Sequence, residues 1–151
     1  MTTKKKTIHT ALFPGSFDPF TIGHADIVRR ALRLFDGVII AIGVNSDKSE
    51  KNCEERLEHL RALYADNPRV EVLAYHTLTA DLVAQKNASC IIRGIRNESD
   101  LTYESQIAKV NFSLFGIETI WLPADPELKE LSSTVVRELQ RFGKDISKLV
   151  P

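Results

Sequence analysis

Residues 12–24 read Leu-Phe-Pro-Gly-Ser-Phe-Asp-Pro-Phe-Thr-Ile-Gly-His, and this stretch predicts a strand, a loop and a helix in succession. The apolar, β-prone run of residues 8–13 leads into a turn that holds one glycine and two prolines. Apolar residues then recur at helical spacing, which predicts a helix over residues 22–35. Such a unit places loop N–H groups and a helix N-terminus on the same side, where they favour an anion.

His24 belongs to the first turn of that helix. At 100° per residue it lies within about 40° of Val28 and Ala31 in the apolar stripe, so we expect it to point inward over the end of the strand. Thr21 suits the N-cap, and Gly23 would let a ligand approach the backbone. A lone histidine at a helix start is more often an ordinary core residue, but the preceding loop favours phosphate binding here.

The composition is that of a globular protein. The chain has 151 residues, 43% hydrophobic and 26% charged, with a formal net charge of +0, which predicts one domain and no nucleic-acid partner. Residues 1–6 are basic, and because no apolar signal segment follows them we expect a flexible tail. No run approaches the ~20 apolar residues of a membrane span, and Cys53 and Cys90 suggest no disulfide framework. We therefore expect no membrane partner and a cytoplasmic location.

Strand and helix patterns alternate along the whole chain. Strands are predicted at residues 8–13, 38–44, 70–75, 90–92 and 118–122. Helices are predicted at residues 22–35, 54–64, 79–86, 98–115 and 135–141. Regular alternation with short loops predicts an α/β fold, a Rossmann-like, doubly wound, five-stranded parallel sheet with helices on both faces.

Phosphate groups are bound by cations, N–H donors and hydroxyl groups that converge, and four segments offer them. These are the Gly15–Ser16–Phe17 loop with His24, Lys48 after the second strand, Arg93 and Arg96 after the fourth strand, and Ser132–Ser133–Thr134 before the last helix. Ligands of doubly wound sheets lie beyond the carboxyl ends of the strands, so we expect one common site. Each group also has an ordinary interpretation: Lys48 and Arg137 as solvent-facing charges, and the Ser-Ser-Thr run as a helix cap.

The predicted helix at residues 98–115 has apolar residues on two faces. One stripe contains Leu101 and Phe112, and a second, about 150° away, contains Tyr103 and Leu114. One face can pack on the sheet, and the other needs a partner. This pattern predicts a homo-oligomer.

Taken together, these motifs resemble the phosphopantetheine adenylyltransferase family of the nucleotidyltransferase superfamily. The superfamily's T/HxGH motif stands here as Thr21–His24. The resemblance runs from about residue 12 to residue 150 and rests on PGSFDPFTIGHADIVRRA, CEER, IIRGIRNESDLTYESQIA and LSSTVVREL. The RGIR segment followed by Tyr103-Glu104 discriminates this family best.

The resemblance implies a set of site residues. It assigns catalytic roles to His24, Lys48, Ser16 and Arg96. It assigns ATP binding to Ser16, Phe17, His24, Gly94, Ile95, Arg96, Glu104, Leu128, Lys129, Glu130, Leu131, Ser132, Ser133 and Thr134, and phosphopantetheine binding to Ser16, Lys48, Thr79 and Arg93. Three positions depart from the family pattern: Ser16 stands where threonine is common, Thr79 where a bulky apolar residue is usual, and Glu130 where an aromatic residue is common.

The implied reaction is in-line attack of the 4′-phosphopantetheine phosphate on the α-phosphorus of ATP, which gives dephospho-coenzyme A and pyrophosphate. The phosphate nucleophile is already ionised, so no general base is needed. Mg²⁺ would be carried by ATP, because no Asp/Glu cluster suggests a protein-held metal. The resemblance also implies a hexamer. Two alternatives remain: nicotinamide mononucleotide adenylyltransferase or another small nucleotidyltransferase, and a non-catalytic nucleotide-binding sensor.

Overall fold

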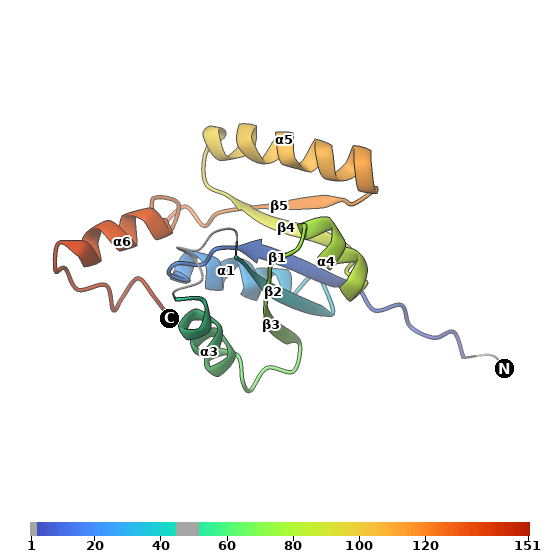
Figure 1. The fold of residues 1–151 in the computed structure, drawn as a ribbon, viewed down its shortest axis with the longest axis horizontal. Helices are drawn as coiled ribbons and strands as arrows, with labels where there is room; N and C mark the ends of the chain where they lie inside the picture. The colour runs from blue at the N-terminus through green and yellow to red at the C-terminus, as the bar shows by residue number, and fades with distance from the viewer. Residues whose placement is uncertain (1–2, 45–51) are drawn as a thin grey trace.

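The computed structural model describes residues 3–44 and 52–151, and in this part the chain forms one five-stranded sheet with the strand order β3-β2-β1-β4-β5 (Figure 1). The strands are β1 (Thr10–Gly15), β2 (Gly37–Gly43), β3 (Val70–Tyr75), β4 (Cys90–Ile95) and β5 (Thr119–Pro123). The helices are α1 (Ile22–Ala31), α3 (Cys53–Leu63), α4 (Thr79–Lys86), α5 (Glu98–Phe115) and α6 (Ser133–Arg141). All strand pairs are parallel, which confirms the predicted α/β class.

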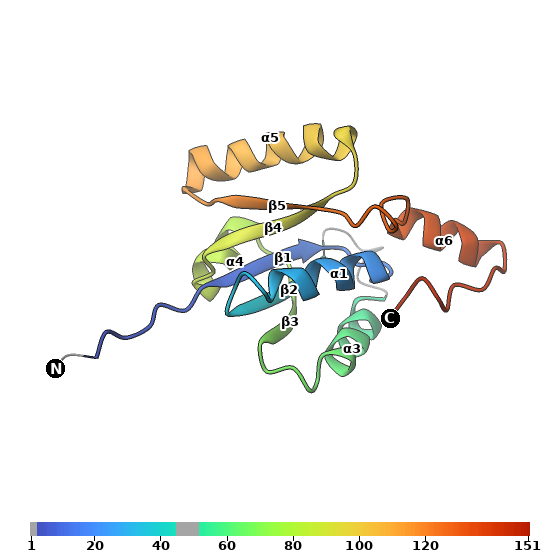
Figure 2. The ribbon, with the colours of Figure 1, turned by 180° about the vertical axis from the view of Figure 1, so that it is seen from behind.

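Helices cover both faces of the sheet, as the doubly wound prediction requires. On one face Phe13 of β1 and Ile40 of β2 pack with Val28 of α1 and residues of α3. On the other face, Leu12 of β1 packs with Leu82 of α4. Figures 1 and 2 show α4 and α1 in front of the sheet from opposite sides. Adjacent strand residues point to opposite faces, so the continuous apolar run of β2 is explained by cover on both sides.

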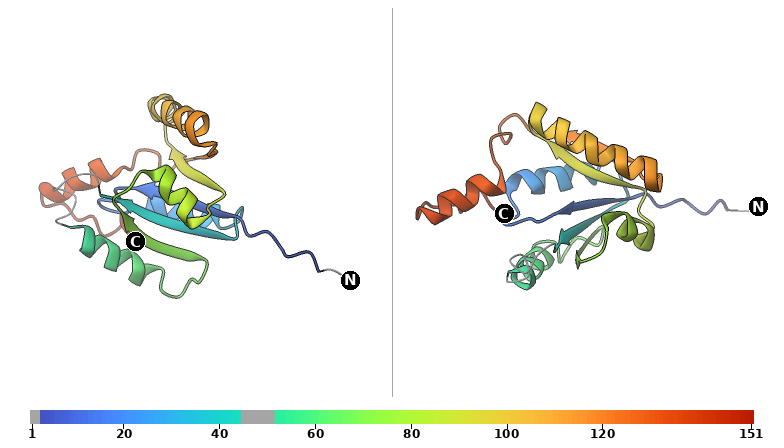
Figure 3. Two further views of the ribbon diagram at one scale, coloured as in Figure 1. Left: turned by 45° about the vertical axis from the view of Figure 1, so that its right-hand side comes forward. Right: turned by 45° about the horizontal axis from the view of Figure 1, so that its top comes forward.

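The strand order changes direction at β1. From β1 the chain proceeds outward through β2 to β3, then returns to the other side of β1 for β4 and β5. The chain therefore leaves β1 toward one face of the sheet and leaves β4 toward the other face. A crevice opens between these two connections, at the carboxyl ends of β1 and β4. Figure 3 shows α6 projecting from this end of the sheet, while the N-terminal segment leaves at the opposite end.

Several element ends differ from the sequence-based prediction for local reasons. The first strand begins at Thr10, where pairing with Gly37 starts, and leaves Ile8 70% exposed. The first helix ends at Ala31, where the backbone bonds change to turn-like pairs three residues apart, Arg33 to Arg30 and Leu34 to Ala31. Beyond this end, Arg69 donates to the carbonyl groups of Phe35 and Asp36.

The fourth strand extends three residues further than predicted, through Ile95, because it keeps pairing with β5 up to the Ile95–Pro123 register. Arg93 and Gly94 therefore belong to the strand, and only Arg96 follows it. The last helix begins at Ser133, two residues earlier than predicted.

Helix α5 departs most from expectation. Gly116 ends it in a left-handed conformation with φ of 66°, as its sequence suggests. Neither apolar stripe is buried, however: Leu101 is 40% exposed, Phe112 57% and Leu114 70%. The expected packing of one stripe on the sheet is wrong in the single chain, because α5 lies at the edge of the sheet, beside the last strand (Figure 1). No helix in the described ranges is long and apolar enough to cross a membrane.

Candidate active site

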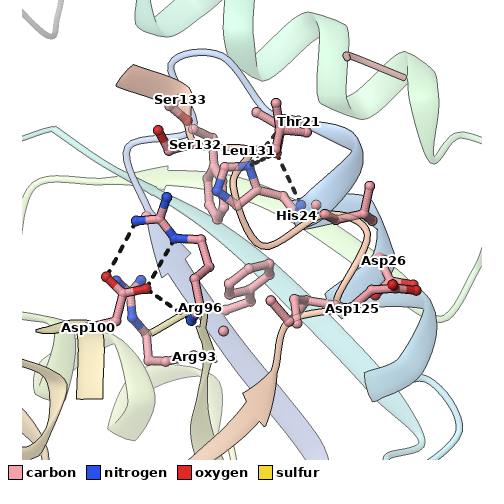
Figure 4. A pocket seen from close by; sticks show the side chains of 18 of the residues that line it. Thr21, His24, Asp26, Arg93, Arg96, Asp100, Asp125, Leu131, Ser132 and Ser133 are labelled. Atoms are coloured by element: carbon pink, nitrogen blue, oxygen red, sulfur yellow. Dashed lines mark hydrogen bonds and ion pairs between the residues drawn. The ribbon is translucent and has the colours of Figure 1, made fainter. Parts of the chain in front are cut away.

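A cavity of about 280 Å³ opens at the carboxyl ends of β1 and β4, where the topology places a ligand site (Figure 4). Its walls come from the loop after β1, the first turn of α1, the end of β4 and residues 124–134. The structure brings most of the residues predicted to bind ATP to this cavity: Ser16, Phe17, His24, Gly94, Arg96, Glu104, Leu128, Leu131, Ser132, Ser133 and Thr134. Ile95, Lys129 and Glu130 lie beside these residues in the chain but do not line the cavity.

The loop after β1 has a constrained shape. Phe17 adopts a positive φ of 48°, and its ring lies over Gly15, where a Cβ atom would come within 2.9 Å of the ring. A side chain at position 15 would therefore displace the ring. The Phe17 ring also contacts His24, with the ring centroids 5.1 Å apart and nearly perpendicular. Phe20 stacks on His24 at 5.4 Å, so aromatic residues fix the plane of the imidazole.

His24 is held by a capping box at the start of α1. Thr21 is the N-cap, as predicted; its backbone N–H donates to Nδ1 of His24 at 2.9 Å, and its hydroxyl accepts from the backbone N–H of His24 at 3.3 Å. Nδ1 is thus an acceptor, so the neutral ring carries its proton on Nε2. Burial, helped by the positive charges of Arg93 and Arg96, lowers the pKa of His24 to about 4. At pH 7 the residue is a neutral N–H donor at the cavity wall.

The N-terminus of α1 is less open to an anion than the sequence suggests. The N–H of Ile22 donates to the carbonyl of Leu149 at 3.0 Å, and the N–H of Ala25 donates to the carbonyl of Thr21. The N–H of His24 is engaged as well, so the donors left in this first turn are the imidazole side chain and the N–H of Gly23, which has no partner among the described residues.

Arg96 lies across the cavity from His24 (Figure 4). Its guanidinium donates to Asp100 through Nε at 3.1 Å, and the backbone N–H of Arg96 donates to the same carboxylate at 3.0 Å. Asp100 stands in the first turn of α5, whose N-cap is Asn97. These contacts fix a cation at the strand end, where it can meet phosphate oxygens.

The start of α6 closes another side of the cavity. Ser132 is the N-cap and accepts from the N–H of Val135. The hydroxyl of Ser133 donates to the carbonyl of Pro19 at 2.7 Å, and Arg137 Nη1 donates to the carbonyl of Asp18 at 2.5 Å. Arg137 is exposed to solvent, as its ordinary interpretation expects, but it also attaches α6 to the loop after β1.

A second, larger cavity of about 680 Å³ lies on the other face of the sheet, between the start of α4 and helix α5. Thr79 lines it, with its hydroxyl hydrogen-bonded to that of Tyr75 at 2.8 Å. Apolar side chains of α5, Ile107 and Val110 among them, form much of its wall. Gly15, Ser16, Arg93 and Glu104 line both cavities. The two cavities therefore adjoin at the carboxyl ends of β1 and β4.

Comparison with known proteins places these features in a family. A family model described as cytidylyltransferase-like matches residues 12–139. Curated phosphopantetheine adenylyltransferases of Phocaeicola vulgatus and Bacteroides thetaiotaomicron are each 51% identical over 142 residues, which is 93% of this chain and 94% of theirs. The phosphopantetheine adenylyltransferase of Porphyromonas gingivalis is 49% identical over 97% of this chain and 95% of its own length.

The chain belongs to the phosphopantetheine adenylyltransferase family. A more distant likeness bears on the fold alone. The crystal structure of a bifunctional NMN adenylyltransferase/ADP ribose pyrophosphatase from Francisella tularensis matches with a TM-score of 0.67 at 18% identity. That match covers 95% of this chain and 45% of the other.

Not every residue assigned from resemblance to phosphopantetheine adenylyltransferases can be placed. Lys48 lies outside the described residues. Arg93 and Glu104, assigned to different substrates, bond directly: Arg93 Nη2 donates to Glu104 Oε1 at 2.7 Å. The remaining assignments for ATP and phosphopantetheine keep the status of predictions.

The contacts also show positioning residues that sequence reasoning missed. Arg56 of α3 donates through Nη1 to the carbonyl of Ser16 at 2.6 Å and so fixes the backbone where the two cavities adjoin. Arg56 could have been found from the sequence, because it ends the CEER run, one of the segments shared with phosphopantetheine adenylyltransferases. Asp100 was missed as well, although its spacing of four residues from Arg96 suggests a helical ion pair.

The carboxylates that line the first cavity are already engaged. Asp26 pairs with Arg29 and Arg30, which lower its pKa against the opposing effect of burial. Asp125 accepts from the N–H of Glu127, and Asp100 is held by Arg96. Within residues 3–44 and 52–151 no three His, Cys, Asp or Glu side chains are grouped as metal ligands.

Proposed function

We propose that this chain transfers the adenylyl group of ATP to 4′-phosphopantetheine, which yields dephospho-coenzyme A and pyrophosphate in coenzyme A biosynthesis. One observation carries the proposal beyond family membership: two cavities on opposite faces of the sheet adjoin at Ser16 and Arg93. A reaction that joins two phosphate-bearing substrates needs such a junction, because both reacting groups must reach one point.

The first cavity suits ATP. His24 offers a neutral N–H donor and Arg96 a fixed cation, and we assign them to the α-phosphate and to the β- and γ-phosphates, respectively. The start of α6, with Thr134 and the N-cap Ser132, adds a helix N-terminus beside the same phosphates. Leu128 and Leu131 supply apolar contact at the wall formed by residues 124–134.

The second cavity suits the acceptor. Phosphopantetheine has a phosphate at one end and a long arm with amide groups at the other. Arg93, at the junction, would bind its phosphate, and Ser16 would orient it. The cavity of about 680 Å³ between α4 and α5 has room for the arm, with Thr79 near its polar part. Lys48 completes the proposed cation set, as assigned from family resemblance.

The chemistry requires positioning rather than proton transfer. An oxygen of the acceptor phosphate forms a bond to the α-phosphorus while the bond from that phosphorus to the bridging oxygen of the β-phosphate breaks. The electron pair leaves with pyrophosphate. His24 and Lys48 would stabilise the charge that builds on the α-phosphoryl oxygens.

We assign Mg²⁺ to the triphosphate rather than to a protein cage. This fits the donor set, because Asp26, Asp100 and Asp125 each already accept hydrogen bonds from neighbouring groups. The ion would neutralise the leaving pyrophosphate. We also propose that the chain works in the cytoplasm as a homo-oligomer, a hexamer by family resemblance, which would cover the exposed apolar side chains of α5.

Pyrophosphate release from Mg·ATP tests the function, with 4′-phosphopantetheine and nicotinamide mononucleotide offered in parallel. We expect release only with phosphopantetheine. Release only with the mononucleotide would overturn the assigned acceptor while leaving the ATP site. ATP binding without release in either reaction would indicate a nucleotide-binding sensor.

A further inference from the structure

Helix α5 buries a carboxylate instead of an apolar side chain. Glu104 is 6% exposed and is the buried residue of α5, whereas the large apolar side chains of the same helix are 40% or more exposed. Burial of a charged group is unfavourable unless the group is paired and hydrogen-bonded. The burial of this one charge, on a helix whose leucines and phenylalanines are exposed, therefore indicates that Glu104 has a partner in the site.

The partner of Glu104 is Arg93. Oε1 of Glu104 accepts from Nε of Arg93 at 3.0 Å and from Nη2 at 2.7 Å. Nη1 of Arg93 donates to the carbonyl of Pro14 at the end of β1. A guanidinium has five N–H donors, so these contacts within the described chain use three and leave one on each terminal nitrogen. Two such hydrogens suit bidentate binding of a phosphate.

The ion pair stands where the two cavities adjoin. Both Arg93 and Glu104 line the first cavity and the second. The guanidinium therefore borders both cavities, and the Glu104 and Pro14 contacts fix its orientation. Both Arg93 donors share Oε1 of Glu104, so Oε2 is left to accept from a neutral donor such as a ribose hydroxyl.

We propose that Glu104 is a positioning residue that acts through Arg93: it orients the guanidinium so that its two remaining donors bind the phosphate of the acceptor. This role is additional to the ATP contact that family resemblance implies for Glu104, which Oε2 remains able to make. The inference rests on the proposed function, since it requires a phosphate-bearing acceptor in the second cavity.

Steady-state kinetics of Glu104→Gln and Glu104→Ala separate the two roles. Each substrate is varied while the other is saturating, and pyrophosphate release is measured. For Glu104→Ala we expect kcat/KM for phosphopantetheine to fall ~10-fold or more, and this loss, unlike any change in the KM for ATP, should depend on Arg93. Glu104→Gln, whose amide oxygen still accepts from Arg93, should lose less. Glu98→Gln, an exposed glutamate on the same helix, is the matched control and should match the wild type.

A double-mutant cycle with Arg93→Ala gives the decisive readout. If Glu104 acts through Arg93, adding Glu104→Ala to Arg93→Ala causes no further loss for phosphopantetheine. A loss of kcat/KM for phosphopantetheine of the same size in both backgrounds would overturn the proposal, because Glu104 would then act independently of Arg93. If thermal unfolding shows that Glu104→Ala is not folded, Glu104→Gln replaces it in the cycle. Its smaller loss of kcat/KM for phosphopantetheine should likewise disappear in the Arg93→Ala background. Absence of turnover in the wild type would instead refute the proposed function, so the two failures are distinguishable.

Discussion

At the residue scale, the central feature is a histidine whose neutral form is fixed by the protein. The backbone N–H of Thr21 requires an unprotonated Nδ1, and burial together with Arg93 and Arg96 disfavours the imidazolium. A neutral donor avoids a desolvated charge at this buried position and can still donate to a phosphoryl oxygen, as proposed. The same ring also stabilises the helix start, so one residue serves fold and site.

This arrangement predicts an unusual titration. In the free protein the His24 resonance in ¹H–¹³C NMR should have a midpoint near pH 4, compared with 6.5 for an unperturbed histidine. Because the unfolded chain binds this proton at higher pH than the folded chain does, the free energy of unfolding should fall as pH drops from about 6.5 to about 4. His24→Asn assigns the resonance, and a midpoint at or above 6.5 would contradict the assignment.

Removal of the imidazole should affect the transition state more than substrate binding. We expect His24→Ala to lower kcat by ~10²-fold or more, the scale for loss of one transition-state donor. His59→Ala, an exposed histidine on α3, is the matched control and should leave kcat unchanged. Circular dichroism checks that α1 still forms without the capping box. A kcat within ~3-fold of wild type for His24→Ala would refute the catalytic role.

The sequence located His24 correctly because helical periodicity and the N-cap are local properties. It could not reveal that Arg137 bonds to Asp18 or Arg93 to Pro14. Those acceptors are backbone carbonyl groups brought near by tertiary structure, between 79 and 119 residues away along the chain. The pattern of side chains along the sequence does not indicate which distant backbone carbonyl group an arginine will contact.

At the element scale, α6 is attached to the rest of the protein through few contacts. Val136 is its one fully buried side chain, and the neighbouring Val135 is 43% exposed. Polar contacts from Ser133 and Arg137 to the loop after β1 supply much of the attachment. The element that covers the first cavity is thus held by hydrogen bonds that a moderate perturbation can break.

Loss of the Arg137 side chain should loosen this helix. We expect Arg137→Ala to speed amide hydrogen exchange over residues 133–141 about 10-fold, since a hydrogen bond from a charged group contributes ~1.5 kcal/mol. The KM for ATP should rise in parallel. Arg141→Ala removes an exposed arginine from the same helix and serves as the control. Equal exchange in the two variants would mean that Arg137 does not anchor α6.

Element types were predictable, while several ends were not. Period-2 and period-3.6 patterns placed every strand and helix described above. The end of β4 depended on its pairing with β5, and the path of the chain just after α1 depended on Arg69 from a distant loop. Both are long-range contacts that a local pattern does not contain.

At the scale of the whole molecule, apolar side chains gather on the α5 edge. Leu114 and Phe112 on the helix, with Ile120 and Trp121 on β5, are each 38% or more exposed. Exposed apolar clusters of this kind usually mark interfaces. The second cavity, which α5 also lines, was not predicted, because it depends on how α5 sits relative to α4.

Light scattering should therefore give a mass that is a multiple of 17.0 kDa at micromolar concentration. Leu114→Glu, which adds a charge to the exposed edge, should reduce that mass. Ile8→Glu changes an equally exposed apolar residue in the N-terminal segment, 70% exposed like Leu114, and should leave the mass unchanged. A 17 kDa wild-type particle would contradict the oligomer.

The central claim is that the two cavities present the acceptor phosphate directly to the α-phosphorus of ATP. The stereochemistry of transfer tests it: ATP made chiral at the α-phosphorus by sulfur substitution is reacted with 4′-phosphopantetheine, and the product's configuration is read by ³¹P NMR. A single in-line displacement predicts a phosphorothioate analogue of dephospho-coenzyme A with inverted configuration. Retention would indicate a covalent adenylyl-enzyme intermediate and would contradict direct transfer between the adjoining cavities.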